Sequence, residues 1–208
     1  MAKYVINPEH PGKMQCHKFE IEIEYVHNLK ELYKRLQFYL EDEGWLDLWG
    51  DVNYEIRYWQ KNHPGDREEH QIWWRAWKTP STPYTKNEFF KYFFTIDYQT
   101  INSQRKEIMH QGKKWKLWNT NTILRVTGYL IVDYEDSFGN GRSWNDNWFL
   151  KTIRGRWHEW MYKEEIERQT AEMESETVKL QNVIKDFLAI RKDTELAPNV
   201  YPENMLPQ

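Results

Sequence analysis

Hydrophobic and polar residues alternate along several stretches of the chain, which is the pattern of a β-strand with one face in the core and one in water. The clearest case is KFEIEIEYV, where four apolar side chains fall on one face and three glutamates on the other. A later pair of strands flanks QGKK like a short hairpin. The further expected strands are 52–61, 69–78, 88–101, 105–110, 114–118 and 123–134.

Two other segments repeat their apolar residues at helical spacing. The first follows Asn28, which caps the helix with Glu31 as its capping-box partner, and it ends at Gly44. The second is a long C-terminal helix that starts at about residue 145. Its stripe has the 3.5-residue period of a coiled-coil seam, and consists of Ile166, Thr170, Met173, Thr177, Leu180, Ile184 and Phe187. This stripe packs either along its own sheet or against a second copy, so a homodimer through this helix is one hypothesis.

A run of strands followed by a helix indicates the α+β class. We expect a curved antiparallel sheet of about six strands, with one helix in the N-terminal half and a long C-terminal helix. Residues 1–16 contain two prolines and no periodicity, and are interpreted as an irregular arm. Residues 17–190 then form a single domain, and residues 191–208, with three prolines, form a mobile tail.

This order of elements resembles the helix-grip arrangement of START-like and Bet v 1-like proteins over residues 17–190. In that arrangement a curved antiparallel sheet wraps a long C-terminal helix, often around an apolar cavity, which implies a carrier of small hydrophobic ligands. The strands containing YEIRYW and WWR are similar to those of an uncharacterised archaeal protein family. No function is known for that family, so the resemblance implies none.

Composition narrows the classes of protein to consider. The 208 residues are long enough for a core without disulfides, and the single cysteine, Cys16, forms no internal disulfide. With no signal peptide and no apolar run of membrane-spanning length, the expected protein is soluble and cytoplasmic. A formal net charge of −3 argues against a protein that coats nucleic acid, but leaves room for a local basic patch. The 12 Trp, 13 Tyr and 9 Phe exceed what core filling alone requires.

The stretch QIWWRAWK concentrates three of these tryptophans. Strand alternation directs Trp74 into the core and the two other indoles to the opposite face of the sheet. The aromatic and basic residues expected on that outer face are Arg57, Trp59, Trp73, Arg75, Trp77, Phe89, Lys91 and Phe93. Two interpretations remain open: cross-strand packing with cation–π pairs, or a platform that binds a macromolecular partner.

The most basic segment is RKEIMHQGKKWKLW, residues 105–118. It is either a solvated hairpin whose lysines protect a sheet edge or a contact surface for phosphates. Its candidate binding residues are Arg105, Lys106, Lys113, Lys114, Trp115 and Lys116, with Trp118 interleaved among them.

Spacings typical of catalytic, metal or cofactor sites are missing from the sequence. We therefore expect no cofactor and no metal; the trio His10, Cys16 and His17 lacks a fourth zinc ligand. The leading hypothesis is a non-catalytic binding or adaptor protein, whose partner is RNA or another protein, with RNA favoured. The carrier of a small hydrophobic ligand is the alternative, and an enzyme built on the same cavity ranks last.

Overall fold

The computed structural model describes residues 13–80, 90–110, 113–132 and 163–188. In chain order these form β1 (Lys13–Ile23), β2 (Val26–His27), α1 (Leu29–Asp42), β3 (Glu55–His63), β4 (Arg67–Lys78), β5 (Phe90–His110), β6 (Lys113–Val132) and α4 (Lys163–Phe187). The α+β class and the six-stranded antiparallel sheet with two helices are confirmed.

The two ends of the chain differ from the prediction or lie partly outside the described residues. Residues 13–16, expected in the irregular arm, instead begin β1, where 13–15 pair with β6 ahead of a register shift between Gln15 and His17. The remainder of that arm, the first part of the predicted C-terminal helix and the predicted tail lie outside the described residues. Neither helix of the described part is both long and apolar enough to cross a membrane.

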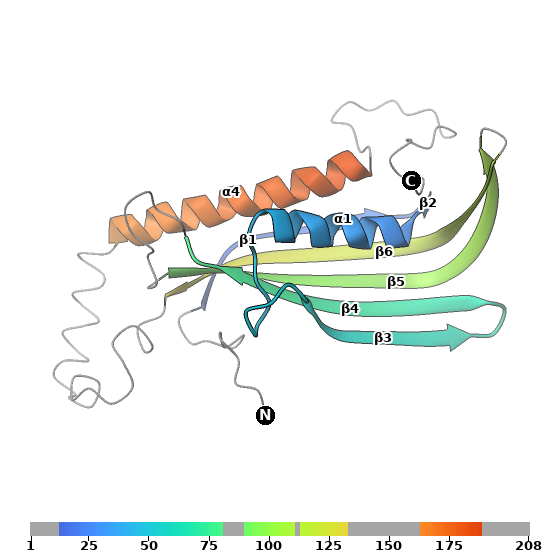
Figure 1. Cartoon of the computed structure of the whole chain (residues 1–208), viewed down its shortest axis with the longest axis horizontal. Helices are drawn as coiled ribbons and strands as arrows, with labels where there is room; N and C mark the ends of the chain where they lie inside the picture. The colour runs from blue at the N-terminus through green and yellow to red at the C-terminus, as the bar shows by residue number, and fades with distance from the viewer. Residues whose placement is uncertain (1–12, 81–89, 111–112, 133–162, 189–208) are drawn as a thin grey trace.

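The sheet has the order β1-β6-β5-β4-β3, all antiparallel, and β2 also pairs with β6. Both helices lie on one side of it (Figure 1). β5 and β6 are 21 and 20 residues long, so the expected short hairpin is continuous with the two central strands. Past the helices these strands curl towards the helix side (Figure 1).

A β-bulge accompanies this bend. The β5–β6 register shifts between Ile101 and Gln104, and Asn102 has a φ of 54°. The Ser103 hydroxyl meets the Thr120 hydroxyl at 2.8 Å beside it, so the buried polar groups at the bend satisfy each other. Bulges bend a strand and reverse the face on which later side chains fall.

Helix α1 follows the predicted capping signals. The Asn28 side chain accepts a hydrogen bond from the backbone N–H of Glu31 at 3.3 Å, and Gly44 adopts a φ of 73° after the last turn. Leucines of the apolar stripe are buried against the sheet, namely Leu32, Leu36 and Leu40. The Asn28 cap, the end at Gly44 and the buried stripe are therefore confirmed, whereas the Glu31 carboxylate accepts from Lys34 at 3.2 Å instead of closing a capping box.

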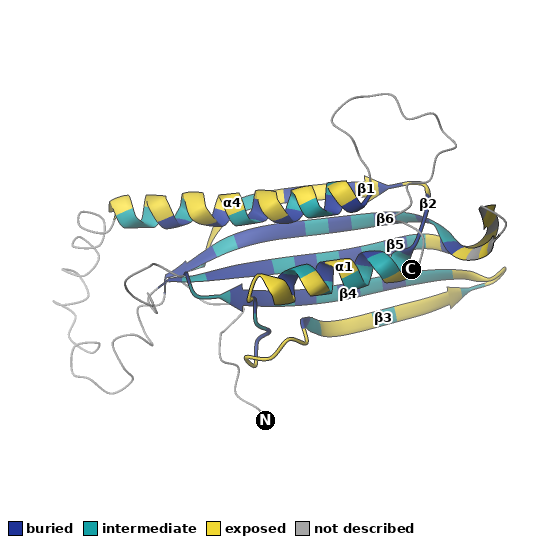
Figure 2. Cartoon of the chain, turned by 45° about the horizontal axis from the view of Figure 1, so that its top comes forward, coloured by how far each residue is buried: buried dark blue, intermediate teal, exposed yellow. Residues whose placement is uncertain are grey.

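Helix α4 lies over β1 and β6 and buries its apolar stripe against them (Figure 2). Gly128 of β6 permits this close approach, since a Cβ there would clash with the Thr177 hydroxyl and lie 2.8 Å from Met173 Cε. The stripe thus packs inside the chain. The homodimer through this helix stays a prediction.

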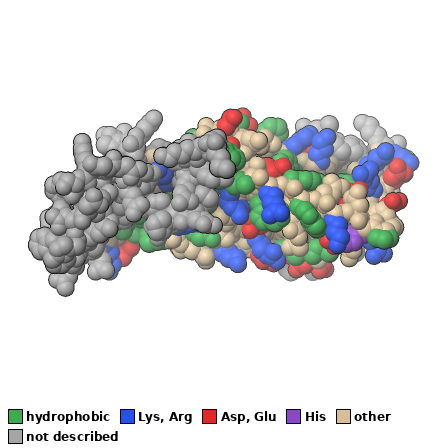
Figure 3. Space-filling model, turned by 90° about the horizontal axis from the view of Figure 1, so that it is seen from below, with side chains coloured by type: hydrophobic (Ala, Val, Ile, Leu, Met, Phe, Trp, Pro, Cys, Tyr) green, Lys and Arg blue, Asp and Glu red, His purple; other side chains and the backbone are tan. Residues whose placement is uncertain are grey.

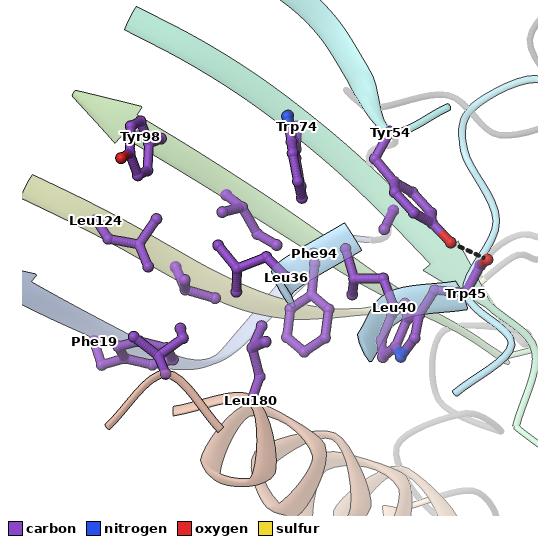
Figure 4. Close-up of a cluster of buried hydrophobic side chains, with 14 of the residues drawn as sticks. Phe19, Leu36, Leu40, Trp45, Tyr54, Trp74, Phe94, Tyr98, Leu124 and Leu180 are labelled. Carbon is purple, nitrogen blue, oxygen red and sulfur yellow. Dashed lines mark hydrogen bonds between the residues drawn. The ribbon is translucent and has the colours of Figure 1, made fainter. Parts of the chain in front are cut away.

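Aromatic rings fill the core between α1 and the sheet (Figure 4). Trp45 lies 4.2 Å from Phe94 between ring centroids, and Tyr33 meets Trp74 edge-on at 4.6 Å. The Tyr54 hydroxyl donates to the Trp45 carbonyl at 2.9 Å. Trp74, predicted to point inward, is indeed buried here.

Candidate functional site

Part of the predicted outer aromatic face is sealed by the chain itself. Trp77 and Phe93 lie opposite the helices, as the alternation predicts, but they are 9% and 0% exposed. They form a second small core with Leu48 and Ile131. The ammonium of Lys13 lies 4.4 Å from the centre of the Phe93 ring. The prediction that Trp77 and Phe93 belong to an open binding surface is therefore wrong.

The loop 46–51 seals this second core. Leu46 exchanges two backbone hydrogen bonds with Trp77, at 2.8 and 2.7 Å. The Trp77 indole N–H also donates to the Asp47 carbonyl at 2.6 Å. The Asp47 carboxylate accepts from the backbone N–H groups of Trp49 and Asp51, which closes the loop into a turn. Main-chain and side-chain hydrogen bonds therefore hold the loop against β4.

The other part of the outer face stays open but is largely satisfied internally. Arg57 is exposed and its guanidinium lies 5.3 Å from the centre of the Trp73 ring. Arg75 is mostly buried and donates to Asp97 at 2.8 Å and to the Trp74 carbonyl at 2.7 Å. Trp59 is half-buried on β3. Basic, acidic and apolar side chains are interspersed on this face rather than gathered (Figure 3), which is the pattern expected of cross-strand packing.

Two further residues were predicted for the outer face, Lys91 and Phe89. Lys91 is half-buried on β5, and its neighbour across the sheet on β6 is Ile131. Phe89 lies outside the described residues.

The basic hairpin lies at the opposite end of the sheet from the second core. We call residues 104–110 and 113–119 the distal hairpin; it extends β5 and β6 past the helices (Figure 1). Its residues carry five basic side chains and one acidic side chain, Glu107. Lys113 and Trp115 belong to β6, but their side chains lie outside the described part.

The register divides the described basic residues between the two faces of the distal hairpin. Arg105 pairs with Trp118 and Glu107 with Lys116, and these pairs share the helix-side face with Lys114. Lys106 is exposed on the other face. Lys114 makes an ion pair with Glu107. The Lys114–Glu107 ion pair is neutral overall, but Arg105 and Lys116 lie on the same face. The helix-side face is therefore the more basic of the two candidate surfaces.

A row of rings adjoins this basic face. We call Tyr58, His70 and Trp118 the ring row; they come from β3, β4 and β6 and lie on the helix side of the sheet. The His70 ring centroid is 6.1 Å from that of Tyr58 and 5.8 Å from that of Trp118. The Arg105 guanidinium lies 5.2 Å from the centre of the Trp118 ring. Tyr58 is 48% exposed, Trp118 is half-buried and His70 is buried at 9%. The Arg105 side chain beside Trp118 is 72% exposed, so Tyr58 and Arg105 are the groups here that are open to solvent.

One carboxylate, that of Glu68, lies among these groups. Glu68 Oε2 is 3.3 Å from Gln60 Nε2 and 3.5 Å from His70 Nε2, and Oε1 is 3.4 Å from Arg105. Burial lowers the pKa of His70, Glu68 opposes that effect, and Arg105 adds to it. These effects favour the neutral imidazole, whose Nε2 faces the carboxylate and whose Nδ1 lies 2.9 Å from the Thr100 hydroxyl.

Sequence reasoning did not identify the ring row. Tyr58 lies on the helix side of the sheet, but neither helix covers it. Ile56 is also exposed, beside a β3 bulge between Glu55 and Arg57. A second bulge, at Ile101–Gln104, directs Arg105 to the same face as Trp118. The alternation of Arg105, Glu107 and Met109 was the available signal, but it did not indicate which face they join.

Within the residues that the structure describes, no three His, Cys, Asp or Glu side chains form a group that could hold a metal ion.

Neither the models of known protein families nor the curated proteins gave a match to this sequence.

Proposed function

We propose that the protein is a non-catalytic binding protein that holds single-stranded RNA on the distal hairpin and the ring row. The observation that carries this proposal is the exposed Arg105 guanidinium 5.2 Å from the centre of the Trp118 ring, on a face that continues through the buried His70 ring to the exposed Tyr58. Aromatic and guanidinium planes on a sheet are the groups on which unpaired bases stack.

The charges of the distal hairpin support the same proposal. Lys114 and Lys116 are exposed on the face that carries the ring row, where their ammonium groups can meet the phosphates of a strand whose bases stack on the rings. Five basic groups against one acidic group make this hairpin cationic in a chain whose formal net charge is −3. The basic groups are therefore concentrated beside the Trp118 end of the ring row.

The carrier and the enzyme gain less support from the described residues. Both need an apolar cavity between the sheet and the helices, whereas Trp45, Phe94 and Trp74 pack closely there with the leucines of α1 (Figure 4). The open outer face around Trp73 is not needed for the proposal: Arg75 there is only 20% exposed and is paired with Asp97, whereas the Arg105 side chain is 72% exposed.

The proposal is tested by a salt titration. Fluorescence anisotropy would follow a labelled single-stranded RNA of mixed sequence from about 50 to about 300 mM NaCl. Each ion pair with a phosphate of a single strand adds about 0.7 to the slope of log K against log salt. We expect the double variant Lys114→Gln with Lys116→Gln to lower that slope by about 1.4.

A matched control removes the same charge elsewhere. Lys18 is exposed on β1 and Lys163 is exposed at the start of α4, away from the distal hairpin. The double variant Lys18→Gln with Lys163→Gln should leave the slope unchanged. No salt-dependent binding by the native protein, or equal effects of the two double variants, would contradict the proposed site.

A further inference from the structure

We propose that Glu68 makes this site selective for an unpaired guanine; the inference rests on the proposed function and names the base. The Glu68 side chain is 19% exposed, and its carboxylate lies between His70 of the ring row and Arg105. A negative charge here repels phosphate, so within a cationic surface it suits only the hydrogen-bond donors of a base.

The contacts of Glu68 leave it able to accept more hydrogen bonds. Its three neighbouring donors lie at 3.3–3.5 Å, beyond the usual N–H···O distance of about 2.9 Å. An ionised carboxylate has about four lone-pair positions on its two oxygens. Glu68 is thus oriented by weak contacts from several sides without being saturated by any of them.

The same contacts fix the position of the carboxylate relative to the rings. The Tyr58 hydroxyl donates to Gln60 Oε1 at 3.3 Å, and Gln60 Nε2 donates to Glu68. On the other side, Arg105 contacts both Glu68 and the Trp118 ring. A base stacked on this row would therefore bring its edge close to Glu68.

Guanine matches a carboxylate better than the other bases do. Its N1–H and 2-amino group are two neighbouring, parallel donors, and a carboxylate offers two parallel acceptors. Adenine and cytosine each offer an amino group next to a ring-nitrogen acceptor. Uracil offers one N–H between two carbonyl oxygens, which the carboxylate repels. We therefore expect the order guanine first and uracil last.

The test compares short oligouridines that carry one central guanosine, inosine, adenosine or uridine. A bidentate contact typically discriminates by about 10-fold or more, so we expect the guanosine strand to bind at least that much more tightly than the uridine strand. Inosine lacks the 2-amino group and should lose most of this preference.

Glu68→Gln should bring the guanosine-to-uridine affinity ratio close to unity, because an amide offers only one acceptor and repels one donor. Glu69→Gln is the matched control: Glu69 is the next residue on β4, and it contacts His63 at 3.2 Å instead. The guanosine-to-uridine affinity ratio of the Glu69→Gln variant should equal that of the native protein.

The outcomes separate the two proposals. Salt-dependent binding with no preference for guanosine, or an equal loss of preference in both glutamate variants, overturns the role of Glu68 alone. Binding of none of the strands overturns the RNA-binding function and this inference with it. The guanosine-to-uridine affinity ratio is measured first on the native protein. The test of base preference therefore does not depend on how well the variants fold.

Discussion

The second core behind the sheet leads to a prediction about Trp77. Removing its indole by Trp77→Ala opens a cavity between Leu48, Phe93 and Ile131, and takes the donor from the Asp47 carbonyl. A large aromatic side chain buries roughly 200 Å², which at about 25 cal/mol per Å² corresponds to about 5 kcal/mol as an upper limit. Measured truncations of buried aromatics cost about 3–5 kcal/mol. We expect a loss in that range.

Two tryptophans provide the comparison. Trp74→Ala, in the main core, should cost the same, about 3–5 kcal/mol. Trp49 belongs to the sealing loop itself, but its side chain is 41% exposed. In the Trp49→Ala variant, solvent fills the space that the removed indole occupied. We expect only about 1–2 kcal/mol there, because no closed cavity forms. Urea unfolding followed by far-UV circular dichroism measures all three. If Trp77→Ala cost no more than Trp49→Ala, the loop 46–51 would not seal a second core.

Two further predictions concern α4 and the buried histidines. Gly128→Ala should destabilise the fold by about 1–3 kcal/mol, since its Cβ would meet Thr177, and adding Thr177→Ala should recover part of that loss in a double-mutant cycle. Burial lowers the pKa of both His27 and His70, so the unfolded chain binds more protons, and the free energy of unfolding should fall as the pH drops below about 6.5. Urea unfolding across this pH range should show a smaller fall for His27→Gln; an identical fall would contradict the role of burial.

The elements that the sequence predicts best are those set by local signals. Asn28 and Gly44 bound α1 as expected, because capping and positive φ depend on a few neighbouring residues. The alternation of β4 likewise places Trp74 in the core and Trp77 on the opposite face. Both results follow from the two-residue period of a strand.

Exposure, in contrast, depends on contacts that no local pattern contains. Trp77 is covered by a loop thirty positions earlier in the chain, through the bond to Asp47. Tyr58 lies on the helix side of the sheet, yet α1 and α4 do not reach it. Both effects define the site. Trp77 and Phe93 are excluded because the chain itself buries them, and Tyr58 is included because no helix covers it.

Bulges are the second reason why the sequence did not predict which side chains share a face. The register shifts at Ile101–Gln104 and at Glu68–His70 decide which side chains join the ring row. A bulge inserts one residue with almost no effect on the hydrophobic pattern, but reverses the face of every residue after it. The sequence therefore identified the distal hairpin as basic without indicating that Arg105 and Trp118 would extend a row of rings.

The most direct test of RNA binding at the ring row uses the indole N–H signals in a nitrogen–proton correlation spectrum, with Trp118 assigned through Trp118→Phe. Adding the guanosine-containing strand should shift the Trp118 signal and leave Trp45 and Trp74, which are 0% and 4% exposed, in place. An unchanged Trp118 signal, with shifts at Trp59 and Trp73 instead, would place the RNA on the opposite face and contradict the proposed site.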